Sequence, residues 1–416
     1  MRWDISASVP PSSRSHSGSW PVADTTSDVL VIGAGLHGLS TAFHLARRGI
    51  KVTVLEADYA GRHASGVNAG GVRTLGRHLA EIPLSLASRE IWHNLPELLG
   101  DDASFVASGQ LKLAETEAEL AQCQMRVAEL QANGFTHEVL IDRTEVFELL
   151  PTVAPHVVGG IWVADDGYAV PFRVVTAVRR AAQRLGVVVH EQTPALAITQ
   201  QASHWHVSTP KGRFEADHLV VTAGAWAGRL AADIGEPVPT YPQGLMLMVT
   251  HRVAPFCKQV LGATGRALSF KQFDNGTVVI GGKLIGDLDF DARHGEVDIT
   301  RLITSALTVT DLFPHLTHLG INRAWAGIEA FTIDDLPVIS HSCRASGLTY
   351  SFGYCGSGFQ MSLGTGERVA QLVLGESSSI DLAAFAIDRF NLDSSALRAS
   401  KEPSCNRSPE SKPTSA

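Results

Sequence analysis

The sequence is poor in the features that mark metal-binding, membrane-spanning and nucleic-acid-binding proteins. Its five cysteines are an odd number, scattered and without a Cys-x-x-Cys pair, and its histidines show no metal-like spacing. We therefore expect no metal site, and reduced thiols in a cytoplasmic protein. No apolar run reaches the roughly 18 residues of a membrane-spanning helix. The formal net charge is −8 without a basic block, which argues against nucleic acid or an anionic membrane as a partner.

Both ends of the chain lack the apolar residues that a packed core needs. Residues 1–27 are rich in Ser and Pro and have no continuous apolar core of a secretory signal, and residues 392–416 are equally polar. We expect a disordered leader and a disordered tail. The length between them is enough for two domains with buried cores.

The most informative stretch runs from Asp28 to Glu56. An apolar run over 29–32 is followed by Gly-x-Gly-x-x-Gly over 33–38, then by a helix-forming segment and a second apolar run that ends on Glu56. This order of strand, glycine turn, helix, strand and acid is typical of a dinucleotide-binding fold.

Each residue type in this stretch has a physical reason. Gly33 permits the tight turn, Gly35 lets the backbone approach a diphosphate, and Gly38 lets the helix pack closely on the strand. The helix N-terminus supplies free N–H groups and the positive end of its dipole. Glu56 lies 18 residues after Gly38 (56 − 38), where a carboxylate can accept hydrogen bonds from a ribose 2′-OH, which argues against a 2′-phosphorylated cofactor.

The segment after this acid, residues 57–73, is unusually rich in small residues. Two interpretations stay open: a flexible loop, or a second wall of the cofactor site in which backbone N–H groups come close to the ligand.

Further along the chain, the sequence pattern predicts first parallel strands joined by a helix and then an antiparallel sheet. Residues 150–226 return to a βαβ rhythm, with a helix from Pro171 and an apolar strand that ends in Thr222-Ala223-Gly224. Residues 237–324 predict an antiparallel sheet with one packed helix over 300–312. We expect Gly364 to begin or interrupt a final helix.

Four ordered segments together resemble a known family. They are the strand and glycine turn over 31–38, the small-residue run over 64–71, Trp325 to Glu329 with the segment 334–339, and the run from Gly353 to Phe359. The sequence resembles the D-amino-acid oxidase family of FAD-dependent oxidoreductases, which includes glycine and sarcosine oxidases and the β subunits of sarcosine, opine and hydroxyproline dehydrogenases. The resemblance covers residues 28–390.

This resemblance implies an α/β fold in two parts. We expect a Rossmann-like FAD-binding domain, discontinuous in sequence, over 28–85, 150–226 and 325–391. An inserted α+β substrate domain, built on an antiparallel sheet, is expected over 86–149 and 227–324.

The expected cofactor is FAD, because a single glycine turn is accompanied by distant glycine-rich segments, as a long two-part cofactor requires. The last of these leads into a helix whose N-terminus would stabilise negative charge on the flavin. The attachment cysteine of sarcosine oxidases aligns with Gly327, and Cys355 is interpreted as a packing residue, so we expect non-covalent binding. The expected cofactor-binding residues are Gly33, Gly35, Leu36, His37, Gly38, Glu56, Ala57, Ser65, Asn68, Ala69, Gly70, Gly71, Val188, Thr222, Ala223, Gly224, Trp226, Gly356, Ser357, Gly358, Phe359 and Gln360.

For amine oxidation the protein needs to orient and desolvate the substrate and to clamp its carboxylate. The resemblance to sarcosine oxidases makes Arg73 and Arg77 the clamp candidates. Glycine oxidases carry a carboxylate-binding arginine where this chain has Glu329. We expect Glu329 either to meet a cationic amine or basic side chain of the substrate, or to form a structural ion pair with Arg323 or another base. Tyr354 is expected to face the flavin or the substrate.

The sequence leaves the identity of the electron acceptor undecided. The oxygen-activating lysine of sarcosine oxidases falls near Val279, with Lys283 or Lys271 as substitutes, and Gln360 replaces a lysine of the last motif. Oxygen and a protein or quinone acceptor are both retained.

The predicted function is the FAD-dependent oxidation of the C–N bond of a D-amino acid or N-substituted amino acid to an imine that hydrolyses. The alternative is a flavin-bearing β-type subunit of a hetero-oligomeric amine dehydrogenase, inactive alone. A plain NAD-dependent dehydrogenase is the weaker rival.

Overall fold

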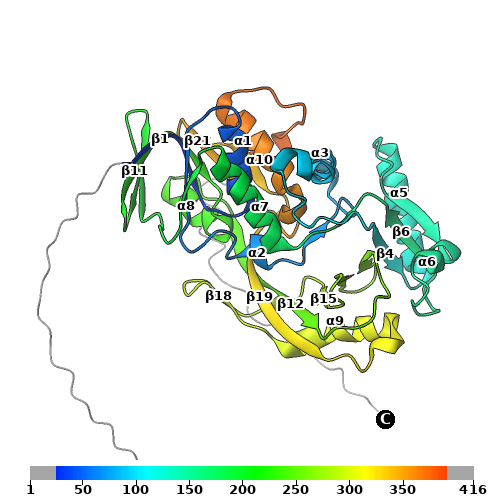
Figure 1. Cartoon of the computed structure of the whole chain (residues 1–416). Helices are drawn as coiled ribbons and strands as arrows, with labels where there is room; N and C mark the ends of the chain where they lie inside the picture. Colours follow the sequence, from blue (N-terminus) through cyan, green and yellow to red (C-terminus); the bar gives the residue numbers. More distant parts are fainter. Residues whose placement is uncertain (1–24, 391–416) are drawn as a thin grey trace, which may run out of the picture.

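The computed structural model describes residues 25–390, which form two large β-sheets with helices packed on each (Figure 1). The first sheet has a parallel centre and antiparallel additions at its sides. In order, its strands are β20 (Val338–His341), β21 (Leu348–Phe352), β11 (Gly212–Val221), β1 (Thr25–Ile32), β2 (Val52–Leu55) and β8 (Val188–His190), with β10 (His204–Thr209) pairing with both β11 and β9 (Ala197–Gln201).

The centre of the first sheet is buried because helices cover it. Every residue of β2 and the last four residues of β1 are buried, as expected for parallel strands that carry helices on their faces. One face packs on a helical layer seen together in Figure 1, and the other on α8 (Ala227–Asp233) and the turn that ends at Phe390. The helical layer comprises α1 (Leu36–Ala46), α3 (Ile82–His93), α7 (Pro171–Arg184) and α10 (Gly358–Leu374), with the short α4 (Leu95–Leu99) beside it.

Helix α10 runs unbroken through Gly364, which we expected to begin or interrupt it. A Cβ atom at Gly364 would lie 2.8 Å from the Cβ of Ser88 on α3, and one at Gly366 would lie 2.1 Å from the Oγ of Ser40 on α1. The two glycines therefore let three helices approach closely, and this packing offsets their low helix propensity.

The second sheet is mostly antiparallel, and only the pairing of β13 with β4 is parallel. One of its faces is covered by α9 (Ile299–Leu312) and α6 (Arg143–Leu149), while α5 (Glu117–Ala132) packs near β6. Its order is β16 (Ile285–Gly286), β12 (Thr240–Thr250), β15 (Val278–Gly281), β14 (Ser269–Gln272), β13 (Val260–Ala263), β4 (Gln110–Ala114), β6 (Gly159–Val163) and β5 (Val139–Asp142), with β19 (Ile321–Thr332) on β12.

The predicted α/β fold with an antiparallel-sheet insertion is confirmed. Three strands, β1, β6 and β19, include residues that we had assigned to a different segment of the chain. Residues 25–27 begin β1 and pair with β11, so they do not belong to a disordered leader; residues 1–24 and 391–416 lie outside the described part. Strand β6 pairs with β4 and β5 in the second sheet. Strand β19 pairs with β12 along nearly its whole length, although we placed residues from 325 onwards in the cofactor domain.

The remaining elements are small and lie between the sheets or at their margins. Within residues 25–390 no helix combines the length and the hydrophobicity that a membrane crossing would require. The small elements are α2 (Ala64–Val67), β3 (Gly71–Val72) paired with β7 (Gly167–Tyr168), the hairpin of β17 (Leu288–Asp289) and β18 (His294–Gly295), and short 3-10 turns at Leu79–Glu81, Gly224–Trp226, Pro314–Leu316, Ala383–Phe385 and Ile387–Phe390.

Candidate cofactor and substrate site

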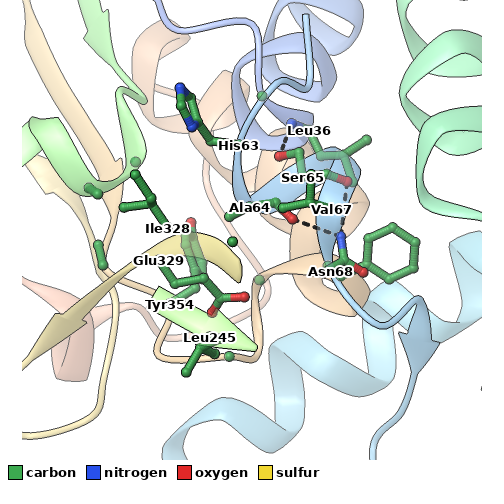
Figure 2. Close-up of a pocket in the computed structure, with 18 of the residues that line it drawn as sticks. Leu36, His63, Ala64, Ser65, Val67, Asn68, Leu245, Ile328, Glu329 and Tyr354 are labelled. Carbon is green, nitrogen blue, oxygen red and sulfur yellow. Dashed lines mark hydrogen bonds between the residues drawn. The ribbon is translucent and has the colours of Figure 1, made fainter. Parts of the chain in front are cut away.

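A cavity of about 800 Å³ lies where the two sheets face each other. Its walls come from the glycine turn after β1, the loop after β2 with α2, the turn after β11, strand β19 and the loop before α10. Figure 2 shows residues of α2, β19 and the loop before α10 around this space. Segments that are distant in sequence therefore line one site.

The glycine turn is fixed by close backbone approaches. Gly33 has φ of +106°, and a Cβ atom there would lie 2.6 Å from the carbonyl oxygen of Thr222. The Thr222 hydroxyl donates to the carbonyl of Ile32 at 2.9 Å and so ties β11 to β1. The N-cap of α1 is Gly35, which has an extended conformation and no side chain that could cap the helix. Of the first N–H groups of α1, that of Leu36 donates to the Ser65 hydroxyl, and those of His37 and Gly38 have no side-chain partner among the described residues and are available to an anionic ligand.

The small-residue segment after β2 forms an ordered wall of this cavity. The Ser65 hydroxyl accepts from the N–H of Leu36 at 2.9 Å, which joins α2 to α1 (Figure 2). The Asn68 amide donates to the carbonyls of Ala64 and Ser65 at 2.8 and 2.9 Å, and its oxygen accepts from Gly70 N–H at 2.7 Å. Hydrogen bonds of its own side chains therefore hold this segment in place, in contrast to the flexible-loop interpretation.

Glu56 lines the cavity with each carboxylate oxygen already held by one N–H group. Its Oε2 accepts from Ala34 N–H at 2.7 Å and its Oε1 from Asp58 N–H at 2.9 Å. Burial raises the pKa of Glu56, and these donors offset the shift in part. Because a carboxylate oxygen accepts more than one hydrogen bond, Glu56 retains capacity for ribose hydroxyls.

The two predicted clamp arginines have different surroundings. Arg73 lines the cavity, and its Nη1 donates to the carbonyl of Leu75 at 3.1 Å; burial lowers the pKa of its guanidinium, against the effect of Asp166. Arg77 does not line the cavity, because its guanidinium turns back and donates to the carbonyl of Arg73 at 2.9 and 3.1 Å. Burial lowers the pKa of Arg77 to about 9.

Glu329 on β19 lines the cavity and carries the most perturbed carboxyl group of the site (Figure 2). Burial raises its pKa to about 7, and Lys283, the N–H of Gly356 and Arg73 offset part of this rise. Among the described residues Glu329 forms no ion pair with Arg323, which is exposed, and none within 4.0 Å with another base; Lys283 and Arg73 act on it only as neighbouring charges. Lys283 lines the same cavity with φ of +60°.

Tyr354 and His37 stack in the cavity wall, with ring centroids 3.7 Å apart and planes 13° apart. The Tyr354 hydroxyl lies 2.6 Å from the Ser351 hydroxyl, and burial raises the pKa of Tyr354. Burial lowers the pKa of His37 to about 3, so the imidazole is neutral. The backbone of Gly358 approaches the His37 ring and offsets this fall of the pKa in part.

Four expected cofactor residues do not line the cavity. Val188 is exposed on β8, the edge strand of the first sheet. Gly38 is enclosed, and a Cβ atom there would lie 2.0 Å from the Gly33 carbonyl oxygen. The Ser357 hydroxyl bonds to Glu81 at 2.8 Å. Gln360 faces α3, where its amide bonds to the hydroxyl and carbonyl of one residue, Ser85.

The other expected residues line it. Besides Arg73, Lys283, Glu329 and Tyr354, they are Gly33, Gly35, Leu36, His37, Glu56, Ala57, Ser65, Asn68, Ala69, Gly70, Gly71, Thr222, Ala223, Gly224, Trp226, Gly356, Gly358 and Phe359.

Sequence reasoning missed the contact that holds β19 against α2. The indole N–H of Trp325 donates to the carbonyl of Val67 at 2.8 Å. A Cβ atom at Gly327 would lie 2.6 Å from a methyl group of Val67. Gly327 in the predicted motif was the available signal, since glycine permits such a close approach.

Lys271, which the sequence offered as a substitute for the oxygen-activating lysine, has no hydrogen-bond partner at its amine within the described residues. Its side chain on β14 is fully buried and does not line the cavity. Burial, with a contribution from Arg73, lowers the pKa of Lys271 to about 7.

These features fit a long cofactor with a diphosphate and a ribose. The N-terminus of α1, where only the N–H of Leu36 has a side-chain partner among the described residues, suits the diphosphate, and Glu56 suits the ribose. Lining residues from both sheets give the cavity the extent that such a cofactor needs.

Comparisons with known proteins identify the family to which this chain is similar. Residues 28–372 match the family described as FAD dependent oxidoreductase, DAO. The chain is 28% identical over 376 residues to a glycine oxidase of Bacillus licheniformis, covering 87% of this chain and 97% of that protein. It is 28% identical over 404 residues to the β chain of a sarcosine oxidase of Rhodobacter capsulatus, covering 94% of this chain and 96% of that protein.

Solved structures show the same fold. The glycine oxidase of Geobacillus kaustophilus superposes with a TM-score of 0.81 at 26% identity, covering 88% of this chain and 99% of that one. The L-proline dehydrogenase of P. horikoshii superposes with a TM-score of 0.82 at 26% identity, covering 88% and 98%. The predicted family, the dependence on FAD and the enzyme class are confirmed: this chain belongs to the DAO family of FAD-dependent oxidoreductases.

Proposed function

We propose that this protein uses non-covalently bound FAD to oxidise the C–N bond of an amino acid or N-substituted amino acid. The product is an imine, which water hydrolyses to an oxo acid or aldehyde and an amine. The observation that carries the proposal is the presence of a guanidinium, Arg73, and a carboxyl group, Glu329, in the wall of one cavity. An amino acid carries the two complementary groups.

Each of the two side chains has a distinct task. Arg73 binds the substrate carboxylate through two N–H donors. Ionised Glu329 accepts a proton at a carboxylate oxygen from the substrate ammonium, so that the amine becomes neutral. Its pKa of about 7 suits a group that must accept and release a proton near neutral pH. FAD, when bound, supplies the two-electron acceptor for the C–H bond next to the amine.

The first experiment is anaerobic absorbance spectroscopy of the purified protein with D-amino acids, sarcosine, prolines and opines. Bleaching of the flavin band by one class supports the proposal and identifies the substrate class. Readmitted air then separates an oxidase from a dehydrogenase with a protein or quinone acceptor. A yellow protein that no member of the panel bleaches contradicts the proposal.

Arg73→Met tests the clamp with the same readout. We expect the substrate concentration for half-maximal bleaching to rise roughly tenfold to a hundredfold, because a charge-assisted bidentate hydrogen bond is lost. Arg252→Met is the matched control, since Arg252 is exposed and has no side-chain partner among the described residues. If the two variants needed the same substrate concentration for half-maximal bleaching, Arg73 would not bind the substrate carboxylate.

Non-covalent binding is supported by the surroundings of Cys355. Its sulfur lies 3.4 Å from the N–H of Thr332 and 3.2 Å from the carbonyl of Gly353, and burial raises the pKa of the thiol. A protonated thiol held in a turn is a poor nucleophile. Acid precipitation should therefore release all flavin to the supernatant, whereas a yellow pellet would indicate a covalent link.

A specific observation favours a second candidate, a flavin-bearing component of a larger enzyme. On α9 the side chains of Ile299, Ile303 and Leu307 are 62%, 49% and 57% exposed and follow each other at intervals of four residues. Such an apolar stripe is typical of a surface that a partner covers. Failure of every substrate with the chain alone, and bleaching after a partner protein is added, would select this candidate.

We further propose that the first sheet and its loops carry the cofactor, that the second sheet forms the substrate side, and that the protein is cytoplasmic. The last point is supported by the four cysteines that the structure describes, all of which are free thiols.

A further inference from the structure

A small hairpin leaves the second sheet and reaches loops of the first. Strands β17 and β18 pair over Leu288–Gly295 and Asp289–His294, and in Figure 1 β18 lies below α8. The base of the hairpin is fixed on β19, because a Cβ atom at Gly295 would lie 2.9 Å from the Cβ of Ala326. The hairpin is therefore attached to one sheet while its tip contacts the other.

On one side of the tip, Phe290 packs against the segment after β11. Its ring stacks on Trp226, with centroids 5.2 Å apart and planes 10° apart. The guanidinium of Arg229 lies 4.2 Å from the centre of the Phe290 ring and donates to Asp291 at 2.9 Å. Of these residues, Trp226 and Arg229 line the cofactor cavity.

On the other side of the tip, Arg293 contacts the segment after β2. Its Nη1 donates to Asp58 Oδ2 at 3.2 Å, and the same oxygen lies 3.0 Å from His63 Nε2. The Arg293 guanidinium also lies 5.8 Å from the centre of the Trp226 ring. Asp58 is two residues after Glu56 and donates its N–H to it, so Arg293 stands beside the ribose-binding acid.

From this arrangement we propose that the 288–295 hairpin is a strap that retains FAD, with Arg293 as a further cofactor-binding residue at the adenosine end. Three observations support this. Arg293 lines the cavity, although it comes from a hairpin that packs on β19 of the second sheet. The tip contacts both the segment after β2 and the segment after β11, which line the cavity near Glu56. A guanidinium at this position adds a positive charge to a site that must hold a diphosphate.

The strap is suited to opening, because its tip contacts are individually weak while its base is firmly packed. A partly exposed ion pair and a cation–π contact each contribute modestly to binding. Cofactor exchange thus requires only the tip to part from Asp58 and Trp226. The proposal concerns FAD alone and holds whichever substrate the enzyme takes.

The test is FAD binding to Arg293→Ala and Phe290→Ala, with Arg252→Ala as the control on a distant exposed arginine. Flavin fluorescence on dilution gives the rate of FAD release, and titration of the flavin-free protein gives Kd. We expect each strap variant to release FAD roughly tenfold faster, and Arg293→Lys to lie between it and the wild type. Release rates equal to that of the control would overturn the proposal.

A measurement on the unmodified protein covers the case in which a variant does not fold. Hydrogen–deuterium exchange is followed at residues 288–295 with and without FAD. Slower exchange with FAD supports the strap. Unchanged exchange in this hairpin, with slower exchange at the glycine turn after β1, would show that FAD binds without engaging the strap and would overturn it.

Discussion

Replacement of Glu329 by Gln should stabilise the flavin-free protein, and only above pH 4.5. Burial raises the pKa of Glu329 from its usual 4.5 to about 7, so the fold disfavours the ionised carboxylate. Below pH 4.5 the carboxyl group is protonated in both the folded and the unfolded state and resembles the amide. Between pH 4.5 and 7 the folded state binds more protons than the unfolded state, so stability of the wild type falls as pH rises.

The size of the effect follows from the pKa difference. The two pKa values differ by 7 − 4.5 = 2.5, and a difference of one corresponds to about 1.4 kcal/mol, which gives about 3.5 kcal/mol well above pH 7. This value already includes the favourable charges of Lys283 and Arg73, because they contribute to the same pKa. The amide still accepts the Gly356 N–H that the carboxylate accepts.

Urea unfolding at pH 4.5, 6 and 8 measures the difference between Glu329→Gln and the wild type. We expect it to be near zero at pH 4.5 and to grow to about 3 kcal/mol at pH 8. Glu148→Gln, at an exposed glutamate on α6, is the control and should show little change at any pH. A difference for Glu329→Gln that does not depend on pH would refute the reasoning.

Three further predictions concern other parts of the fold. Lys271→Met should stabilise the protein by about 5 kcal/mol below pH 7, since burial lowers the pKa of this lysine from 10.5 to about 7 and each pKa unit corresponds to about 1.4 kcal/mol; the gain should fade between pH 7 and 10.5 in urea unfolding. Gly364→Ala should lower the free energy of unfolding by about 1–3 kcal/mol, because the new methyl group meets Ser88, and an unchanged midpoint in thermal unfolding would contradict this packing. Trp325→Phe removes the 2.8 Å hydrogen bond to Val67 and should cost about 1 kcal/mol, visible as a lower urea midpoint.

The dinucleotide-binding part of the site could be predicted from sequence because its signals are local. Gly33 and Glu56 lie in one strand–turn–helix–strand unit, in which each residue type has a conformational or hydrogen-bonding reason. The structure places both in the cavity wall, and the same holds for Asn68, whose small-residue segment pointed to a close backbone approach.

The directions of single side chains could not be predicted in this way. Arg77 and Gln360 fall in the expected segments, but Arg77 bonds to the backbone four residues before it, and Gln360 bonds to Ser85 on a helix far away in sequence. Strand β19 was assigned to the wrong sheet because its partner β12 is distant in sequence and its composition does not reveal the pairing. The contact of Arg293 with Asp58 was missed for the same reason, since the two residues are 235 positions apart in the chain.

The way in which the chain alternates between the sheets has a consequence for its synthesis on the ribosome. The chain passes from one sheet to the other four times, between β2 and β4, β6 and β8, β11 and β12, and β19 and β20. Strand β11 can pair with β21 only after residues 348–352 have left the ribosome. The loop before α10, which also lines the cavity, is synthesised after β21. A nascent chain that ends before this loop lacks part of the cavity wall. We therefore expect FAD to bind late in synthesis or after it.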